Sequence, residues 1–154
     1  MPARALKAFL DENGVDYETL PHEATYTAQE AAAATHVPGK EVAKTVIVKV
    51  EGEMAMAVVR ATDRVSVARL EEVTGGEVEL AEEEEFRTRF PGVDPGAMPP
   101  FGNLYEMEVF VDQALRQDET IAFNAGSHTE MVRLAYADFE RLVEPVVAEI
   151  SVSE

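Results

Sequence analysis

The strongest strand signal in the chain is Val42–Val50, Val-Ala-Lys-Thr-Val-Ile-Val-Lys-Val. Its residues are mostly β-branched, which predicts a strand buried on both faces. Glu51-Gly52-Glu53 turns the chain, and Met54–Ala61 resumes the apolar pattern, so an antiparallel hairpin is expected. Lys44 is unusual in such a strand. It is either an edge residue whose stem packs while its ammonium reaches water, or a functional charge that holds a phosphate or ribose.

The remaining elements follow from helical or alternating apolar patterns and from the residues that cap or break them. The expected helices are Arg4–Asn13, Thr27–Thr35 with a capping box at Thr27, a helix capped by Ser66 and running to Val73, Glu82–Phe90, and Ala137–Val143. The other expected strands are Val15–Leu20, Glu77–Leu80, Tyr105–Val111, Thr120–Asn124 and Met131–Ala135. Helices and strands are intermixed without a regular βα repeat. The chain is therefore predicted to be an α/β (α+β) protein with a mixed, mainly antiparallel β-sheet surrounded by helices.

A breaker segment, Gly96–Gly102, reads Gly-Ala-Met-Pro-Pro-Phe-Gly and follows Pro91-Gly92-Val93-Asp94-Pro95. So many glycines and prolines exclude a helix or a central strand. Prolines fix φ and lack an N–H group, while glycines let a ligand approach the backbone closely. The loop is suited to the wall of a binding pocket, but taken alone it favours an ordered connector between a helix and a strand, since most clusters of glycine and proline only mark turns. Met98 and Phe101 predict that it packs against the body of the protein.

The length of 154 residues predicts one domain, 1–154, with a real hydrophobic core. No apolar run is long enough to span a bilayer, and the first residues lack a signal-peptide pattern, so a cytoplasmic protein with no membrane partner is expected. The chain has no cysteine, which excludes disulfides, a thiol nucleophile and thiolate metal ligands.

The charge balance is strongly acidic, with 30 Asp and Glu against 13 Lys and Arg and a net charge of −17. Such a field repels polyanions at low salt, and taken alone it argues against nucleic acid as a partner. Screening weakens the repulsion in a salt-rich cytoplasm. Salt adaptation is a hypothesis, and a steep loss of stability on lowering the salt concentration would support it.

The usual catalytic and cofactor motifs are missing from the sequence. His22, His36 and His128 are not spaced as a pair of metal ligands, so neither a metal nor a cofactor is expected. There is no phosphate-binding glycine motif. Ser127 and His128 are adjacent, which is poor geometry for a nucleophile and its base. Considered alone, His22 and His128 are loop or capping histidines and Tyr26 is a packing residue.

Four segments taken together resemble a known family. They are His22 before a Thr-capped helix, Val42–Lys49 with its Lys-Thr pair, Gly96-Ala-Met-Pro-Pro100, and Asn124-Ala-Gly-Ser-His-Thr-Glu130. Their order and spacing resemble the YbaK/prolyl-tRNA synthetase-associated domains, which deacylate mischarged tRNA. The resemblance covers nearly the whole chain, and it implies the same α/β fold, a mischarged tRNA as the partner, and a possible association with prolyl-tRNA synthetase. DNA is not expected as a partner.

The resemblance also implies roles for particular residues. Lys44 matches the strand lysine that holds the 3′-terminal nucleotide, and Gly96 to Pro100 match the loop that lines the scissile ester and places the attacking water. The implied catalytic residues are Lys44, Gly96 and Pro100. The implied substrate-binding residues are His22, Tyr26, Thr45, Met98, Pro99, Asn124, Gly126, Ser127 and His128.

The chemistry requires no side-chain nucleophile, because an aminoacyl ester is already activated and a well-placed water can attack it. The expected substrate is a small amino acid, such as alanine, cysteine or serine, on tRNA-Pro. Two other functions stay open: a non-catalytic module that binds aminoacyl-tRNA, a nucleotide or a synthetase, and a small-molecule ester or amide hydrolase. An acidic tRNA-binding protein needs a local basic patch, and the expected patch, with the Glu82–Glu85 block facing elsewhere, is Lys40, Lys44, Lys49, Arg60 and Arg64.

Overall fold

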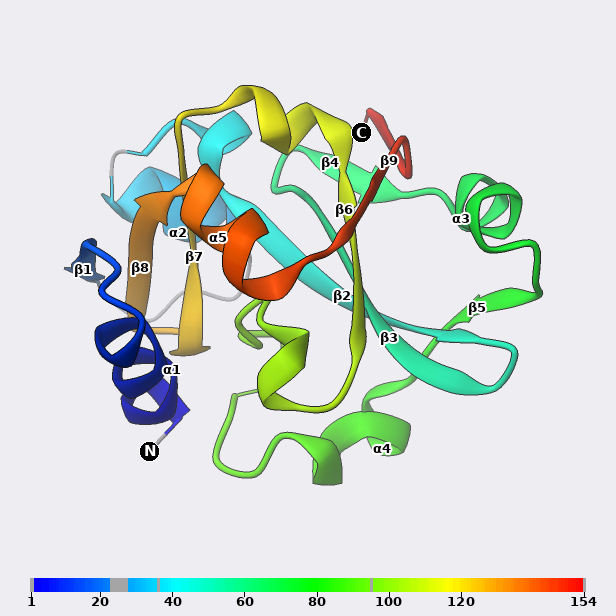
Figure 1. The fold of residues 1–154 in the computed structure, drawn as a ribbon, viewed down its shortest axis with the longest axis horizontal. Helices are drawn as coiled ribbons and strands as arrows, with labels where there is room; N and C mark the ends of the chain where they lie inside the picture. The colour runs from blue at the N-terminus through cyan, green and yellow to red at the C-terminus, as the bar shows by residue number, and fades with distance from the viewer. Residues whose placement is uncertain (1, 23–27, 36, 95, 154) are drawn as a thin grey trace.

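The computed structural model describes residues 2–22, 28–35, 37–94 and 96–153. The hairpin of β2 (Ala43–Val50) and β3 (Glu53–Arg60) crosses the middle of the molecule (Figure 1). The two strands pair antiparallel over their full length, from Ala43 opposite Arg60 to Val50 opposite Glu53. The hairpin predicted from the apolar run is confirmed.

The hairpin forms the centre of a five-stranded sheet with the order β5-β2-β3-β6-β9. The added strands are β5 (Val78–Leu80), β6 (Glu108–Asp112) and β9 (Val146–Ala148). Strand β5 pairs antiparallel with β2, whereas β6 runs parallel to both β3 and β9. A short antiparallel pair, β4 (Asp63–Val65) and β10 (Ser151–Ser153), lies beyond the end of β3.

A second sheet has the order β1-β8-β7 and is wholly antiparallel. Its strands are β1 (Tyr17–Pro21), β7 (Thr120–Ser127) and β8 (Glu130–Ala135). The predicted mixed, mainly antiparallel architecture is confirmed, and its strands are divided between sheets. The larger sheet meets this one at a parallel bridge between Val42 and Ala122.

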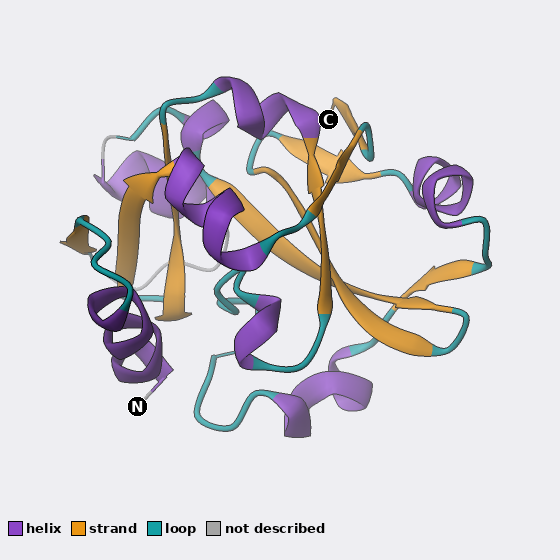
Figure 2. Ribbon diagram, in the orientation of Figure 1, coloured by secondary structure: helices purple, strands orange, loops and turns teal. Residues whose placement is uncertain are grey.

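Helices surround the sheets (Figure 2). They are α1 (Pro2–Glu12), α2 (Ala28–Thr35), α3 (Val67–Thr74), α4 (Glu83–Phe86) and α5 (Tyr136–Val143). Helix α3 has the predicted ends: the Ser66 hydroxyl accepts a hydrogen bond from the Arg69 N–H at 3.2 Å, and Gly75 ends the helix with φ +73°. Thr27, expected to cap α2, lies outside the described residues.

Two predicted boundaries were wrong. The helix expected over Glu82–Phe90 is a single α-turn followed by a 3₁₀ turn at Arg87–Arg89. The strand expected from Tyr105 begins only at Glu108, because the Gly102 carbonyl accepts hydrogen bonds from the N–H groups of Tyr105 and Met107 and holds residues 102–107 in a turn. Residues 146–153, for which the sequence predicts no element, contain β9 and β10.

The two faces of β2 contribute to different hydrophobic clusters, since side chains alternate along a strand. Ala43 and Ile47 belong to the main cluster, which also receives α1, β6 and β7. Val48 belongs to a second cluster beneath α3 and β5. Lys44 shares the face of Val48, and Thr45 shares the face of Ile47. The predicted burial on both faces is confirmed for Ile47 and Val48, while residues 44–46 are half-buried.

Candidate functional site

The site begins where β2 and β7 separate. The strands run parallel through the bridge of Val42 and Ala122. Two residues further along each strand, on the same face, stand Lys44 and Asn124. Strand β5 pairs with β2 only from Val48 onward. Lys44 therefore lies in the part of β2 between the bridge to β7 at Val42 and the start of pairing with β5 at Val48.

A β-bulge near the end of β7 supplies the second part of the site. Pairing with β8 shifts register between Asn124 and Ser127, and Gly126 in the bulge has φ +100°. Its backbone groups bond to the breaker loop: the Gly126 N–H donates to the Ala97 carbonyl at 2.9 Å, and its carbonyl accepts from the Asp94 N–H at 2.9 Å. The bulge thus joins the loop and the turn, two segments that are about 30 residues apart in sequence.

The breaker loop is held firmly by its apolar residues. Ala97, Met98, Pro99 and Pro100 are buried, and Phe101 is fully buried. The Phe101 ring lies 5.5 to 6.1 Å from three other phenylalanine rings, measured between centroids, in the tilted and edge-on arrangements that aromatic pairs prefer. The predicted packing of Met98 and Phe101 is confirmed, and the loop can act as a rigid wall.

Gly96 and His128 face one another across the junction. Gly96 is exposed and has φ +82°, and a Cβ atom placed on it would lie 3.8 Å from Cε1 of His128. The His128 N–H donates to Oδ2 of Asp94 at 3.2 Å. Next to His128, the Thr129 carbonyl accepts from the His22 N–H at 2.9 Å, which brings His22 to the same end of the small sheet. The Ser127 hydroxyl lies 3.2 Å from the Thr129 hydroxyl.

The buried polar atoms that lack a hydrogen-bond partner among the described residues include Oγ1 of Thr45 in β2 and Oδ1 of Asn124 in β7. Asn124 is 9% exposed. Leaving such a group unsatisfied costs about 1 to 3 kcal/mol, so these groups are typical of sites where a ligand supplies the partner. Asn124 shares the strand face of Ala122, toward α2, and Thr45 points to the opposite face of β2 from Lys44.

The structure thus places most of the predicted site residues in one region and separates one of them. His22, the loop from Gly96 to Pro100, and Gly126 to His128 meet at the junction, with Asn124 and Lys44 on the adjoining strands. Thr45 lies on the other face of β2. Tyr26 lies outside the described residues. Asp94, which sequence reasoning did not select, bonds both the bulge and His128, and its only signal was its position directly before Pro95-Gly96.

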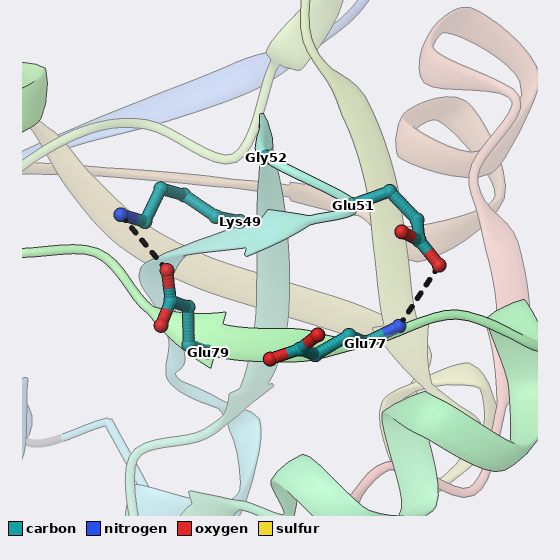
Figure 3. A pocket seen from close by; sticks show the side chains of 5 residues that line it. All are labelled: Lys49, Glu51, Gly52, Glu77 and Glu79. Atoms are coloured by element: carbon teal, nitrogen blue, oxygen red, sulfur yellow. Dashed lines mark hydrogen bonds and ion pairs between the residues drawn. The ribbon is translucent and has the colours of Figure 1, made fainter.

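The predicted basic patch is wrong at two of its five positions. Lys49 forms an ion pair with Glu79 at 3.0 Å (Figure 3) and another with Glu85. The acidic block therefore contacts the hairpin instead of facing away from it. Hydrogen bonds to these carboxylates raise the pKa of Lys49, and Lys49 lowers the pKa of Glu85. Arg60 bonds the Ala114 carbonyl at 2.9 Å and Asp118 at 3.4 Å. Lys40 and Arg64 are exposed.

A pocket of about 280 Å³ lies beside Lys49, at the turn that joins β2 to β3 (Figure 3). Its other lining residues are Glu51, Gly52, Glu77 and Glu79, and the Glu51 carboxylate accepts a hydrogen bond from the Glu77 N–H at 3.1 Å. This wall is acidic and would repel a phosphate. In the described part of the chain no group of three His, Asp or Glu side chains could hold a metal ion. Nor does any helix there have the length and apolarity needed to cross a membrane.

The described residues form an α/β domain in which a rigid loop, a β-bulge and a strand lysine lie near one sheet junction, and such a backbone arrangement defines a protein that can position an activated substrate. Comparison with known proteins identifies the family. Residues 22–142 match the model of the aminoacyl-tRNA editing domain. The chain belongs to this family, and its predicted resemblance is confirmed. Editing domains hydrolyse the ester of a mischarged aminoacyl-tRNA, so the prediction of an ester hydrolase is confirmed as well.

Individual relatives agree with this assignment. The chain is 30% identical over 147 residues to the multifunctional Ser/Thr-tRNA deacylase ProXp-y of Escherichia coli strain K12, covering 91% of this chain and 87% of the relative. The fold matches a crystal structure of a candidate trans-editing enzyme for prolyl-tRNA synthetase with a TM-score of 0.84 at 22% identity, covering 99% and 98% of the two chains. It also matches a hypothetical protein of known structure with a TM-score of 0.85 at 23% identity, covering 96% and 99%.

Proposed function

We propose that the protein is a trans-editing deacylase that hydrolyses the ester between a small amino acid and a mischarged tRNA. The observation that carries the proposal is the hydrogen-bonded junction of the Gly96–Pro100 loop with the bulge at Gly126, in the strand that is bridged to β2 two residues before Lys44. A rigid wall next to a cation is suited to holding a terminal nucleotide and its ester while water attacks.

Each part of the junction has a role in the proposed reaction. Lys44 binds and orients the 3′-terminal nucleotide as a point charge. The buried prolines keep the loop from yielding when the ester docks against Gly96. The N–H groups of Ala97 and Gly126 already donate within the junction, to Asp94 and Ala97. Stabilisation of the developing oxyanion therefore falls to Lys44 and to backbone groups around Gly96, and a substrate hydroxyl or amine relays the proton.

Serine is the first amino acid to test, because it is among the small residues expected from the sequence and is also named for the Escherichia coli relative. Threonine, alanine and cysteine complete the panel. The proposed carrier is tRNA-Pro, and a prolyl-tRNA synthetase is the proposed partner, supported by the description of one structural relative. Asn124, on the strand face that Lys44 shares, supplies a polar atom that discriminates between side chains with and without a hydroxyl.

The test is the release of labelled amino acid from seryl-, threonyl-, alanyl- and cysteinyl-tRNA by wild type and by Lys44→Ala. We expect wild type to hydrolyse at least one species, and the variant to lose about 100-fold or more of the rate, as when an electrostatic contact to the reacting centre is removed. Arg141→Ala is the matched control, because it removes one positive charge at an exposed position in α5, outside the junction. A folded Lys44→Ala protein with full activity would overturn the role of this lysine.

The acidic surface favours a second candidate, a hydrolase of small-molecule esters. The net charge is −17, and Lys49 and Arg60 are engaged by carboxylates rather than available to phosphates. A small ester needs no basic patch. Binding of uncharged tRNA separates the two functions: a dissociation constant that rises steeply with salt supports the editing enzyme, and no binding supports the small ester.

A further inference from the structure

We propose that Asp94 is a positioning residue of the deacylation site, acting through the backbone of His128. The proposal rests on the proposed function, and nothing in the family comparison assigns Asp94 a role. Asp94 lies in the loop before Gly96. Its main chain bonds to Gly126, and its side chain bonds to the N–H group of His128.

The bulge in β7 explains why such a residue is needed. Because β7–β8 pairing shifts register between Asn124 and Ser127, the strand ladder does not fix the backbone at Gly126. The breaker loop fixes it instead. The Asp94 N–H donates to the Gly126 carbonyl and the Gly126 N–H donates to the Ala97 carbonyl, both at 2.9 Å. These two bonds hold the bulge but do not reach the two-residue turn that carries His128.

The Asp94 side chain extends this contact to the turn. Its Oδ2 accepts the His128 N–H at 3.2 Å, while its carbonyl accepts the Ala97 N–H at 3.0 Å. One residue therefore ties the loop to both the bulge and the turn. The imidazole of His128 lies close to Gly96. The hydrogen bond from the His128 N–H to the Asp94 carboxylate therefore fixes the distance between the loop and the turn. A substrate ester placed against Gly96 depends on that distance.

The proposed role of the Asp94 side chain is to accept a hydrogen bond, and two variants can separate this role from the effect of charge. Asp94→Ala removes the acceptor, while Asp94→Asn keeps a side-chain oxygen at the same position. Both raise the net charge by one, which by itself favours tRNA binding. Glu72→Ala, at an exposed position in α3, makes the same change of charge away from the site.

The experiment measures kcat and KM for the aminoacyl-tRNA that wild type hydrolyses, together with amide hydrogen exchange at His128. We expect Asp94→Ala to lower kcat about 10-fold with little change in KM, since looser placement of the wall slows the reaction more than it weakens binding. His128 exchange should accelerate about 10-fold in the same variant. Asp94→Asn and Glu72→Ala should stay near wild type in both measurements.

Two results would overturn the proposal: an unchanged kcat in Asp94→Ala, or an Asp94→Asn variant as impaired as Asp94→Ala. Failure of the proposed function is separately visible. If wild type hydrolyses no aminoacyl-tRNA, the deacylase function is wrong, and His128 exchange in the two variants alone decides whether Asp94 holds the turn.

Discussion

Glycine-to-alanine substitutions at the two ends of the breaker loop should have different effects for different physical reasons. At Gly96 there is room for a methyl group, since the nearest atom to a built Cβ is Cε1 of His128 at 3.8 Å, but φ is +82°. At Gly102 no positive φ is involved. A Cβ there would lie 2.4 Å from the Met107 carbonyl oxygen and 2.5 Å from Cγ2 of Val109, distances that real Cβ atoms do not show.

The magnitudes follow from these two environments. A left-handed backbone costs an L-residue about 1 to 2 kcal/mol, which is the whole expected loss of stability for Gly96→Ala. For Gly102→Ala the backbone must move, which costs about 1 to 3 kcal/mol for overpacking. The same movement disturbs the two hydrogen bonds at 2.9 Å that the Gly102 carbonyl accepts, at about 1 kcal/mol each. The expected total for Gly102→Ala is about 3 to 5 kcal/mol.

Denaturant unfolding followed by circular dichroism, with deacylation measured on the same samples, tests the contrast. Gly75→Ala is the matched control, because Gly75 has φ +73° with no atom within 4 Å of a built Cβ and ends α3 away from the junction. It should lose as much stability as Gly96→Ala while keeping full activity, whereas Gly96→Ala should lose activity as well. Equal destabilisation by Gly96→Ala and Gly102→Ala would refute the reasoning.

Two further predictions concern stability away from the site. Asp112 is 3% exposed, and its carboxylate accepts hydrogen bonds from the N–H groups of Ile150 (2.9 Å), Ser151 (3.1 Å) and Ala114 (3.0 Å). Asp112→Ala should therefore lower the free energy of unfolding, measured with denaturant, by about 3 to 5 kcal/mol. A loss below about 1 kcal/mol would contradict this anchoring role. Lys49 lowers the pKa of Glu85 below its ordinary 4.5, so the stabilisation that Glu85 provides is present above pH 4.5 and lost as the pH falls through its folded-state pKa. The stability difference between wild type and Glu85→Gln should therefore be constant from about pH 6 to 8 and shrink below about pH 4, and a difference independent of pH would contradict the ion pair.

Local signals in the sequence predicted the elements whose cause is local. The apolar run of β2 and β3, the Ser66 cap and the Gly75 stop of α3 each act within a few residues, and each appears as expected. Strands β4, β9 and β10 were not predicted. Each is three residues long, shorter than the roughly four residues over which alternation is usually recognised, although the equally short β5 was predicted. They exist because of pairing with distant residues and because buried Asp112 binds the backbone of the tail.

The candidate site shows the same division. Its residues were found through the resemblance, since single motifs such as Lys-Thr or Gly-Ser-His were uninformative alone. The ion pairs of Lys49 with Glu79 and Glu85 could not be predicted from the sequence, because β5 and α4 are distant from the hairpin in sequence and contact it only in the folded protein. The expected basic patch failed for this reason: it grouped cations by strand and left out the carboxylates that the fold brings beside them.

The site lies where regular β-structure is interrupted. Strands β2 and β7 separate after a single bridge, and β7 contains a bulge just before its turn. Each interruption frees backbone groups and edge positions that a continuous sheet would occupy. The breaker loop forms hydrogen bonds with the backbone groups of Gly126. Lys44 lies in β2 between the bridge to β7 and the part paired with β5. Because the walls of this site are backbone fixed by buried prolines and aromatic rings, their geometry is set by the fold before any substrate arrives. Such preorganisation suits the proposed hydrolysis, in which water attacks an activated ester and no side chain acts as the nucleophile.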